Sequence, residues 1–368
     1  MDLLCRLEGH KGLPSYEIDN IVISSHRFDS GKNAHVVNDP DADIVENKSF
    51  AYLTVRAKDR RESAGKKPIM ILHGLNEKCW SKYLPWAAAI TAKSGRPVIL
   101  FPIAFHMDRA PKSWSDPRAM FVKSKRRKEL FPGLKNSSFA NASLSQRLQE
   151  LPERFLAAGL QSFLDIADFA LALRNGELPY FQENSTLDIL AYSIGAILGK
   201  VLLMAGPEDL FDESRLFMFC GGALLADSYP VTKAILDEAG FVSLISFLGR
   251  TGKGPASGGG TLEAEAVKCF RCLISSGENT GLREKKLSLL AERMFYFTLT
   301  GDKVIPPAAI DGLYASHDGR IEYYHLTKDF PFAYSHEAPF PLAQSRNIEI
   351  SAVEDSFNSF IDMVLDFF

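Results

Sequence analysis

The sequence has 368 residues, of which 46% are hydrophobic and 24% charged, and these values exclude a disordered or fibrous chain. The 42 lysines and arginines nearly balance the 45 aspartates and glutamates, so the net charge of -3 gives no chain-wide attraction for nucleic acid or an anionic membrane. Five cysteines are an odd number for a disulfide framework, and the N-terminus has no secretory signal pattern. We therefore expect a cytoplasmic protein without a membrane span, organised as one or two domains.

The first predicted elements are two β-like runs, at 21–24 and 50–55, within a polar region that covers residues 1–65. We expect them to add strands to a larger sheet. The apolar run 68–72 then ends at a glycine turn, and a helix pattern at 86–95 leads to a second apolar run at 96–105. Near-continuous apolar strands in the order β, α, β are typical of a parallel sheet that is covered on both faces.

A polar, basic insertion at 109–143 precedes a long helix pattern that stops near Gly176. Further apolar strand patterns occur at 187–190, 215–225, 294–300 and 320–328. Between them, residues 226–293 contain helix-like segments around a glycine-rich stretch at 249–260. We interpret 226–293 as a helical cap or lid over a core that is formed by 66–225 and 294–368.

Ser193 lies between the strand pattern LDIL and an apolar helix pattern, in the sequence Ala191-Tyr192-Ser193-Ile194-Gly195. A serine on a tight strand-to-helix turn needs small residues two positions before and after it, because the two backbones leave no room there. Its hydroxyl is then exposed at the edge of the sheet, and the Ile194 N–H can stabilise negative charge at the start of the helix. The pattern predicts a nucleophilic serine.

An acid and a histidine follow Ser193 in the chain. Asp302 comes just after the strand pattern 294–300, and His336 lies in a loop after the next strand pattern. The order serine, acid, histidine, with each residue past a strand end, favours Ser193 as nucleophile, His336 as base and Asp302 as the group that orients the base. His325 and Asp227 are the alternative base and acid.

Other residues at the same edge are candidates for the oxyanion hole or the substrate pocket. The sequence His73-Gly74-Leu75-Asn76 follows the first core strand, so the Leu75 N–H is the expected second oxyanion donor, whereas His73 is interpreted as structural. The candidate substrate-binding residues are Asn76, His106, Arg109 and Tyr192. For Arg109 the choice between binding a substrate carboxylate and forming a structural salt bridge stays open.

The segments HGLN, AYSIG and GDKVIP, together with the loop histidine, resemble the α/β-hydrolase superfamily. The runs HGLNEKCWSKYLPWA, FPIAFHMDRAPKSW and AYSIGA look like a bacterial branch of it that is known mainly as a domain of unknown function. The resemblance covers nearly the whole chain. It implies an α/β fold with a mostly parallel central sheet flanked by helices. The resemblance brings no substrate with it. From the order of Ser193, Asp302 and His336 on this fold, we expect a serine hydrolase that forms an acyl-enzyme on a carboxylic ester or related small-molecule acyl substrate. Ala191 departs from the glycine that usually begins the elbow.

Several alternatives stay open at this point. The triad chemistry needs no metal or organic cofactor, but an acyltransferase, a peptidase or a catalytically silent binding protein could share the fold. The Cys269-x-x-Cys272 spacing lacks further ligands for zinc, and the basic run 123–128 is typical of a solvated face. The segment 249–254 resembles a phosphate loop but has Gly254 where Ser or Thr is required. The sequence does not predict the oligomeric state.

Overall fold

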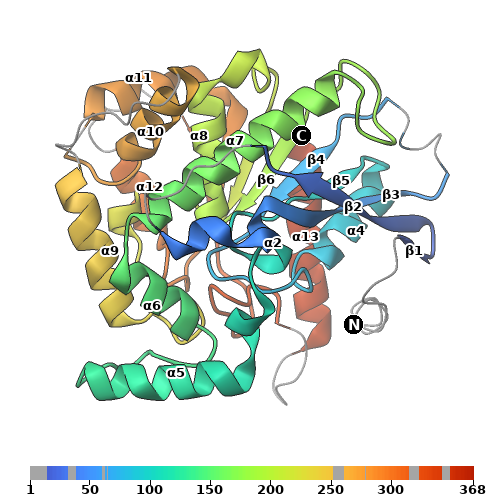
Figure 1. The fold of residues 1–368 in the computed structure, drawn as a ribbon. Coiled ribbons are helices and arrows are strands. Elements are labelled where there is room, and N and C mark those ends of the chain that lie inside the picture. Colours follow the sequence, from blue (N-terminus) through green and yellow to red (C-terminus); the bar gives the residue numbers. More distant parts are fainter. Residues whose placement is uncertain are drawn as a thin grey trace.

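The computed structural model describes residues 15–31, 39–59, 63, 65–251, 261–277, 279–314, 323–341 and 349–368. In this part of the chain one nine-stranded sheet has the order β1-β2-β3-β5-β4-β6-β7-β8-β9, and Figure 1 shows helices around it. The strands are β1 (Ser15–Ile18), β2 (Ile21–Asp29), β3 (Ser49–Ala57), β4 (Ile69–Leu72), β5 (Val98–Leu100), β6 (Asp188–Tyr192), β7 (Leu216–Phe219), β8 (Met294–Leu299) and β9 (Tyr324–Lys328).

The sheet is antiparallel at its N-terminal edge and parallel elsewhere. β1, β2 and β3 pair antiparallel, and β3 continues antiparallel to β5. Every pair from β5 to β9 is parallel. The prediction of a mostly parallel sheet with added N-terminal strands is therefore confirmed. β2 and β3 extend beyond the predicted runs because the two strands pair along their whole length, from Ile21 opposite Ala57 to Asp29 opposite Ser49.

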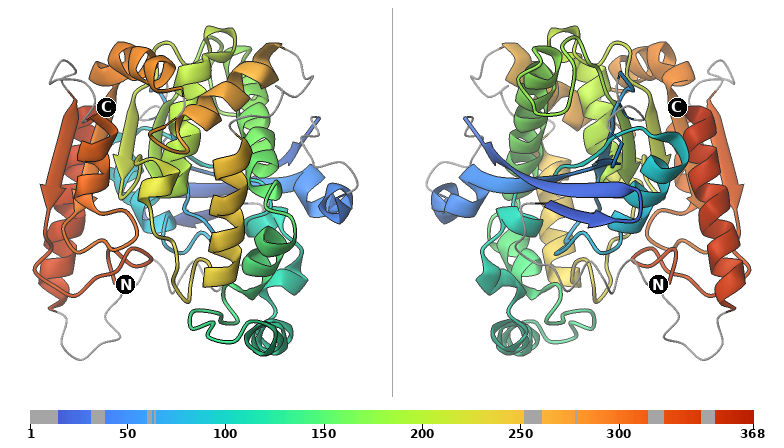
Figure 2. Two further views of the ribbon diagram at one scale, coloured as in Figure 1. Left: turned by 90° about the vertical axis from the view of Figure 1, so that its left-hand side faces the viewer. Right: turned by 90° about the vertical axis from the view of Figure 1, so that its right-hand side faces the viewer.

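Helices cover both faces of the sheet. Figure 2 shows α13 (Ile350–Phe367), in red, on the opposite side of the sheet from α7 (Arg154–Arg174) and α9 (Glu238–Thr251). α4 (Leu84–Ser94) packs beside α13, and α8 (Ile194–Ala205) packs beside α7. The other helices are α2 (Val45–Lys48), α5 (Pro117–Leu130), α6 (Ala142–Glu150), α10 (Thr261–Cys272), α11 (Thr280–Leu290) and α12 (Pro307–Tyr314).

Each face of the sheet has its own hydrophobic core, because successive side chains of a strand point to opposite faces. In β4, Ile69 and Ile71 belong to the core that contains Trp86 of α4, whereas Met70 and Leu72 belong to the core that contains Val201 of α8. All four β4 side chains are completely buried. Coverage on both faces explains why the strand is apolar throughout instead of alternating.

The strand order reverses at β4. The chain passes from β4 to β5 on one side, and later returns to β6 on the other side of β4. The loops that follow β4 and β6 therefore leave the same edge of the sheet in opposite directions. In open parallel sheets such a reversal creates a crevice at the carboxyl ends of the strands, where ligands bind.

The segment predicted as a cap, 226–293, packs in two ways. α9 contacts α6, outside the sheet layers, whereas α10 contacts α8 and α7 and so belongs to a helical layer. The insertion 109–143 contains α5, whose Arg127 forms two bonds of 2.7 and 2.8 Å with Asp237 just before α9. The division into core and cap stays a prediction, and residues 252–260 of the glycine-rich stretch lie outside the described residues.

α7 is the one helix in the described part of the chain that is long and apolar enough to cross a membrane by length and composition. Of the most apolar segment of this helix, 56% is buried inside the protein. Its Asp165 accepts a bond from Arg109, so a charged group of α7 is satisfied within the fold. These contacts are those of a core helix.

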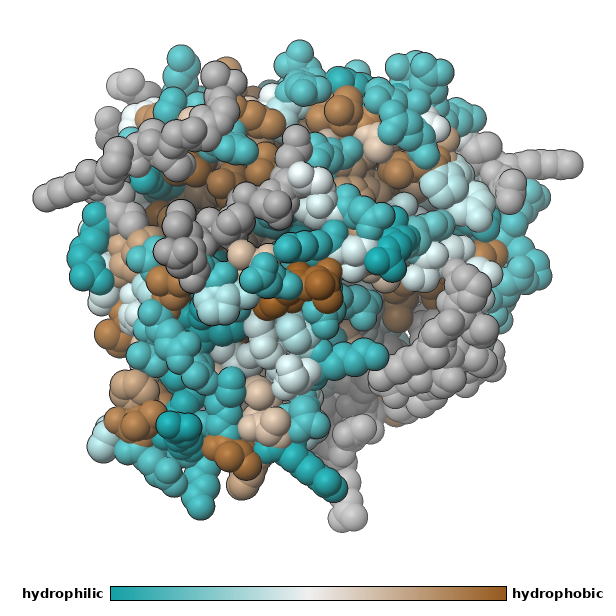
Figure 3. Space-filling model, viewed as in Figure 1, coloured by the Kyte–Doolittle hydropathy of each residue, from teal (hydrophilic) through white to brown (hydrophobic). Residues whose placement is uncertain are grey.

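The surface that faces the viewer in Figure 3 is mostly hydrophilic, with apolar side chains in scattered groups. Phe121, Val122 and Leu130 of α5 are among the exposed large apolar residues. α5 also carries the basic run 123–128, and its Arg127 is buried against Asp237 rather than solvated. Isolated exposed apolar residues are normal on protein surfaces.

Candidate active site

Ser193 occupies the sharp turn between β6 and α8. Its backbone has φ 55° and ψ -122°, a conformation that costs energy for any residue with a Cβ. The end of the neighbouring strand β4 explains the small residue at 195: a Cβ on Gly195 would lie 2.5 Å from the Leu72 carbonyl oxygen. Gly221, which follows β7, is restricted in the same way, because a Cβ there would lie 2.7 Å from the Ser193 carbonyl oxygen. The turn therefore has the geometry of a nucleophile elbow.

The structure brings together the side chains of Ser193, His336 and Asp302. His336 Nε2 lies 2.8 Å from Ser193 Oγ, and His336 Nδ1 lies 2.8 Å from Asp302 Oδ2. Asp302 follows β8, and its Oδ1 accepts hydrogen bonds from the N–H groups of Val304 at 2.8 Å and Ile305 at 3.0 Å. All three side chains are buried. The carboxylate is thus held rigidly by its own loop while it contacts the imidazole.

The hydrogen bonds define the tautomer of His336. An ionised carboxylate accepts hydrogen bonds only, so His336 Nδ1 must carry the proton that is donated to Asp302. In the neutral ring Nε2 is then an acceptor, and the Ser193 hydroxyl donates to it. This arrangement can take up the hydroxyl proton when the oxygen attacks an electrophile.

Tyr192 is buried and lines neither of the two cavities near Ser193 described below, contrary to the prediction that it contacts substrate. Its hydroxyl donates a hydrogen bond to the backbone carbonyl of His336, and its ring stacks on the imidazole with centroids 5.4 Å apart. Burial is the main cause that raises the pKa of Tyr192 well above its usual value, so the hydroxyl stays protonated and able to donate. Tyr192 therefore positions the histidine loop.

Cys220 is a site residue that the sequence interpretation missed. It follows β7, and its buried thiol lies near the charge of the Asp302 carboxylate. Burial, followed by the nearby Asp302 charge, raises the pKa of the Cys220 thiol well above its usual range, so the sulfur remains an S–H donor. The only signal for it was its place at a strand end, which many residues share.

The two expected oxyanion donors lie on either side of Ser193. Ile194 is the first residue of α8, so its N–H has no partner within the helix. Leu75 follows Gly74, where a Cβ would lie 3.5 Å from the Ser193 Cβ, so this backbone passes close to the serine. The Gly74 N–H donates to the Tyr83 hydroxyl at 2.9 Å, which fixes the loop.

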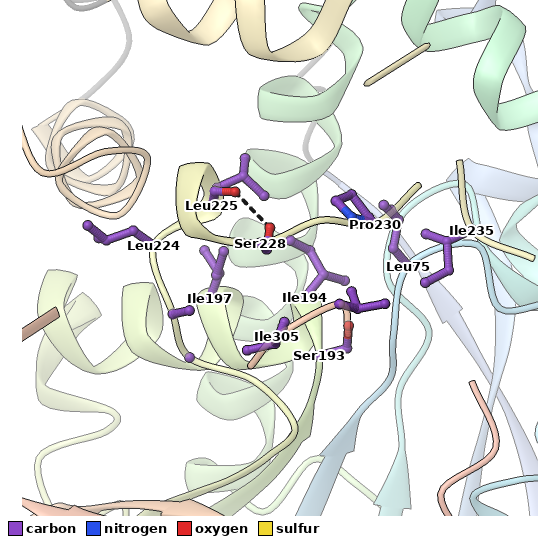
Figure 4. A pocket seen from close by; sticks show the side chains of 13 residues that line it. Leu75, Ser193, Ile194, Ile197, Leu224, Leu225, Ser228, Pro230, Ile235 and Ile305 are labelled. Carbon is purple, nitrogen blue, oxygen red and sulfur yellow. Dashed lines mark hydrogen bonds between the residues drawn. The ribbon is translucent and has the colours of Figure 1, made fainter. Parts of the chain in front are cut away.

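A cavity, called here the serine cavity, opens beside Ser193. Figure 4 shows Ser193 at one end of it, next to Ile194 and Ile305. Nearly all of its other lining side chains are apolar, among them Leu75, Ile197, Leu224, Leu225, Pro230, Ile235 and Val304. The hydroxyl of Ser228 donates a hydrogen bond to the Leu225 carbonyl at 2.7 Å. The serine cavity therefore suits an apolar group next to the nucleophile.

A second cavity adjoins the serine cavity, and Leu75, Ile194 and Ile197 line both spaces. His106, one of the predicted substrate-binding residues, lines this second cavity and not the serine cavity. Its Nδ1 lies 2.9 Å from the Ala104 carbonyl oxygen. His106 therefore faces a space next to the expected oxyanion donors.

The structure corrects two further predictions of substrate contact. Asn76 is buried and lines neither cavity, and both protons of its amide are used by the carbonyls of Ala140 at 3.0 Å and Ala234 at 2.5 Å. The Arg109 guanidinium is 0% exposed and binds Asp165 at 2.6 Å, together with Asn47 and the Pro102 carbonyl. Both side chains hold loops in place, and the structural alternative for Arg109 holds.

The remaining histidines and acids near strand ends have other roles. His73 is completely buried, with Nδ1 2.8 Å from the Gly74 carbonyl and Nε2 accepting from the Ile103 N–H at 2.9 Å. Burial lowers the pKa of His73 to about 3, so it is neutral and structural, as predicted. His325 binds Thr298 and Asp311, and Asp227 is exposed. Neither alternative residue joins the Ser193 group.

The described residues contain no group of three or more His, Cys, Asp or Glu side chains arranged for a metal ion. Cys269 and Cys272 are buried in α10. Burial raises the pKa of Cys269 to about 12 and also raises that of Cys272. Both therefore carry unreactive thiols at neutral pH.

Comparisons with known proteins agree with this architecture. The model of a family of unknown function, DUF6051, matches residues 11–368, and no curated protein matches the chain. Esterase Est22 superposes with a TM-score of 0.50 at 12% identity, over 94% of this chain and 81% of that chain. The carboxylesterase Cest-2923 from Lactobacillus plantarum WCFS1 has a TM-score of 0.47 at 10% identity, over 94% and 95% of the two chains. The peroxisomal α/β-hydrolase Lpx1 from Saccharomyces cerevisiae has a TM-score of 0.44 at 11% identity, over 94% of this chain and 90% of that chain. The predicted α/β-hydrolase fold is confirmed, whereas a bacterial origin stays a prediction.

Proposed function

The chain belongs to the family of unknown function DUF6051 and has the α/β-hydrolase fold, and on this basis we propose that it is a serine hydrolase of carboxylic esters. The observation that carries the proposal is the hydrogen-bonded chain from Ser193 through His336 to Asp302, with 2.8 Å at each link. The strained elbow conformation of Ser193 adds support, because such strain persists where a function requires it.

In the first half of the reaction, Ser193 Oγ attacks the carbonyl carbon of the ester while its proton passes to His336 Nε2. The carbonyl π electrons move to the oxygen, and the Asp302 carboxylate stabilises the imidazolium that forms. When the tetrahedral intermediate collapses, the bond to the alcohol oxygen breaks and the alcohol takes the proton from Nε2. Water then attacks the acyl-enzyme in the same manner and releases the carboxylic acid.

The negative charge on the oxygen is held by the N–H groups of Ile194 and Leu75. The Ile194 N–H also benefits from the positive end of the α8 dipole. Loss of one such donor typically costs about 10²- to 10³-fold in rate. Because the rest of the serine cavity is apolar, we propose that the group next to the scissile bond is aliphatic or aromatic.

Labelling with a fluorophosphonate probe tests the nucleophile. We expect the folded wild-type protein to be labelled and the Ser193→Ala variant not to be. Ser228→Ala is the matched control because it removes the other hydroxyl of the serine cavity, and labelling should persist in it. A folded wild-type protein that does not react would favour a catalytically silent binding protein instead.

Turnover of 4-nitrophenyl acetate tests the base. We expect His336→Ala to lower kcat/KM by at least about 10³-fold in folded protein, because this imidazole takes up the Ser193 proton. His325→Ala is the matched control, since that ring binds Thr298 and Asp311 away from Ser193. If His325→Ala causes the larger loss in folded protein, the assignment of the base is wrong.

A further inference from the structure

The second cavity contains a polar group that the proposed reaction does not use. His106 is 8% exposed and lines this cavity, and its Nε2 atom is buried without a hydrogen-bond partner among the residues that the structure describes. Buried polar atoms in proteins are nearly always paired, so an unpaired one calls for an explanation. A ligand in the adjoining cavity is the explanation that the surrounding residues favour.

The contacts of His106 decide which kind of group would pair with it. Its Nδ1 lies 2.9 Å from the Ala104 carbonyl, which can only accept, so Nδ1 carries a proton and donates it. Burial, and next the nearby His73, lower the pKa of His106 well below its usual value, so the ring is neutral. Neutral imidazole with a proton on Nδ1 offers a lone pair at Nε2. The missing partner must therefore be a donor.

The two arginines that line the second cavity do not need an anionic ligand to balance their charge. Arg147 donates from Nε and Nη2 to Asp41 at 2.8 and 2.5 Å. Arg154 donates to Asp39, with its shortest contact at 2.6 Å. Each guanidinium thus has a carboxylate of its own, and the other lining residues are almost all apolar, including Phe105, Leu148 and Phe270. The cavity suits a neutral, largely apolar group.

We propose that the second cavity binds an apolar group that carries one hydrogen-bond donor, a hydroxyl or an amide N–H, and that His106 Nε2 accepts from it. Resting on the proposed hydrolase function, this group is the part of the substrate remote from the scissile bond. The location supports this assignment, because Leu75, Ile194 and Ile197 line both cavities, so the two spaces adjoin at these residues beside Ser193. Esters with a hydroxylated or amide-bearing apolar chain are then the preferred substrates.

Three probes of similar shape test the ligand class on the wild-type protein. 4-Ethylphenol offers a donor, 4-ethylanisole offers only an acceptor, and 4-ethyltoluene offers neither. We expect 4-ethylphenol to bind about three- to tenfold more tightly than the other two, as measured by titration calorimetry, because a neutral hydrogen bond contributes about that much. In ¹⁵N-histidine NMR, the His106 Nε2 resonance should shift with 4-ethylphenol and not with 4-ethyltoluene. Equal affinities for the three probes with no such shift would overturn the proposal.

A matched pair of variants tests whether His106 causes the preference for 4-ethylphenol. His106→Phe keeps a ring of similar size without the acceptor, so the preference for 4-ethylphenol should vanish while 4-ethyltoluene still binds. His325→Phe makes the same change at a ring outside both cavities and should preserve the preference. A preference that survives in His106→Phe would overturn the assignment. If His106→Phe does not fold, the wild-type NMR measurement decides.

The fluorophosphonate assay keeps this inference separate from the proposed function. Labelling at Ser193 together with equal affinities for the three probes would overturn only the ligand class. Donor preference in a folded protein that is not labelled would support the ligand class and point to a binding protein. Steady-state kinetics then link the two, since 4-ethylphenol should inhibit ester hydrolysis more strongly than 4-ethyltoluene in the wild type and equally in His106→Phe.

Discussion

Lys200 lies in α8, completely buried beneath the site. Its Nζ donates a hydrogen bond to the carbonyl of Gly222, which lines the serine cavity, and lies 6.0 Å from the Tyr296 ring centre. No carboxylate forms an ion pair with it within the described part of the chain. Burial, and secondly the charge of Arg283, lower the pKa of Lys200 to about 7. The folded protein therefore holds this lysine neutral in mildly alkaline solution.

The sign of the resulting pH dependence follows from proton binding. In the unfolded chain Lys200 has its usual pKa of 10.5, so between about pH 7 and pH 10.5 the unfolded state binds a proton that the folded state lacks. The free energy of unfolding therefore rises with pH in this window, by up to about 1.4 kcal/mol per unit. Below pH 7 both states are protonated and the contribution stays constant. From pH 7 to pH 9 the gain is about 2 kcal/mol.

Lys200→Met removes this titration while it keeps a long apolar stem. Urea unfolding followed by tryptophan fluorescence at pH 7 and pH 9 should show that the wild type gains about 2 kcal/mol relative to the variant. Lys286→Met is the control, because the Glu265 partner raises the pKa of Lys286 and both states keep its proton at these pH values. The reasoning is refuted if Lys200→Met and the wild type change equally between the two pH values.

Three other substitutions test positioning and packing. Tyr192→Phe should lower kcat about tenfold with little change in KM, because the His336 loop loses the hydrogen bond from the Tyr192 hydroxyl. Steady-state kinetics on a short ester would show no change if Tyr192 only fills space. Gly195→Ala should destabilise the protein by about 3 kcal/mol in urea unfolding, since the added Cβ meets the Leu72 carbonyl at 2.5 Å, and an unchanged midpoint would contradict the elbow geometry. Arg109→Met should cost about 3 to 5 kcal/mol of stability by leaving Asp165 buried without its partner. A raised KM for esters in the folded Arg109→Met protein, with stability unchanged, would restore its role in substrate binding.

The sequence predicts the elements of the site that depend on local pattern. Ser193 is marked by small residues at 191 and 195, a pattern that is readable within five positions, although the atom that restricts Gly195 is the Leu72 carbonyl oxygen of β4. Asp302 and His336 are marked by their places after apolar runs, because strands of a parallel sheet end at one edge. Such rules bring residues to the same edge without showing which way each side chain points.

The errors concern side chains whose partners are distant in the chain. Tyr192 bonds a backbone carbonyl 144 positions away, and a carbonyl leaves no mark in a sequence. Arg109 follows a strand, as predicted for a site residue, but it turns toward Asp165, 56 positions later on α7. Before the helix is placed against the sheet, nothing distinguishes this ion pair from a substrate contact. Packing therefore decides the role of each residue.

The reversal of strand order at β4 accounts both for the position of Leu75 and Ile194 beside Ser193 and for their place at the boundary of the two cavities. Since β4 and β6 are adjacent and parallel, Leu75 after β4 and Ile194 after β6 both lie beside Ser193, as the proposed oxyanion hole requires. The same two residues, with Ile197 one turn further along α8, line both the serine cavity and the second cavity at His106. The position of the proposed oxyanion donors and the boundary between the cavities thus follow from one backbone arrangement. Under the proposed hydrolase function, a substrate that contacts these residues would be oriented by the same residues that bind its carbonyl oxygen, so that substrate recognition and transition-state stabilisation would be coupled.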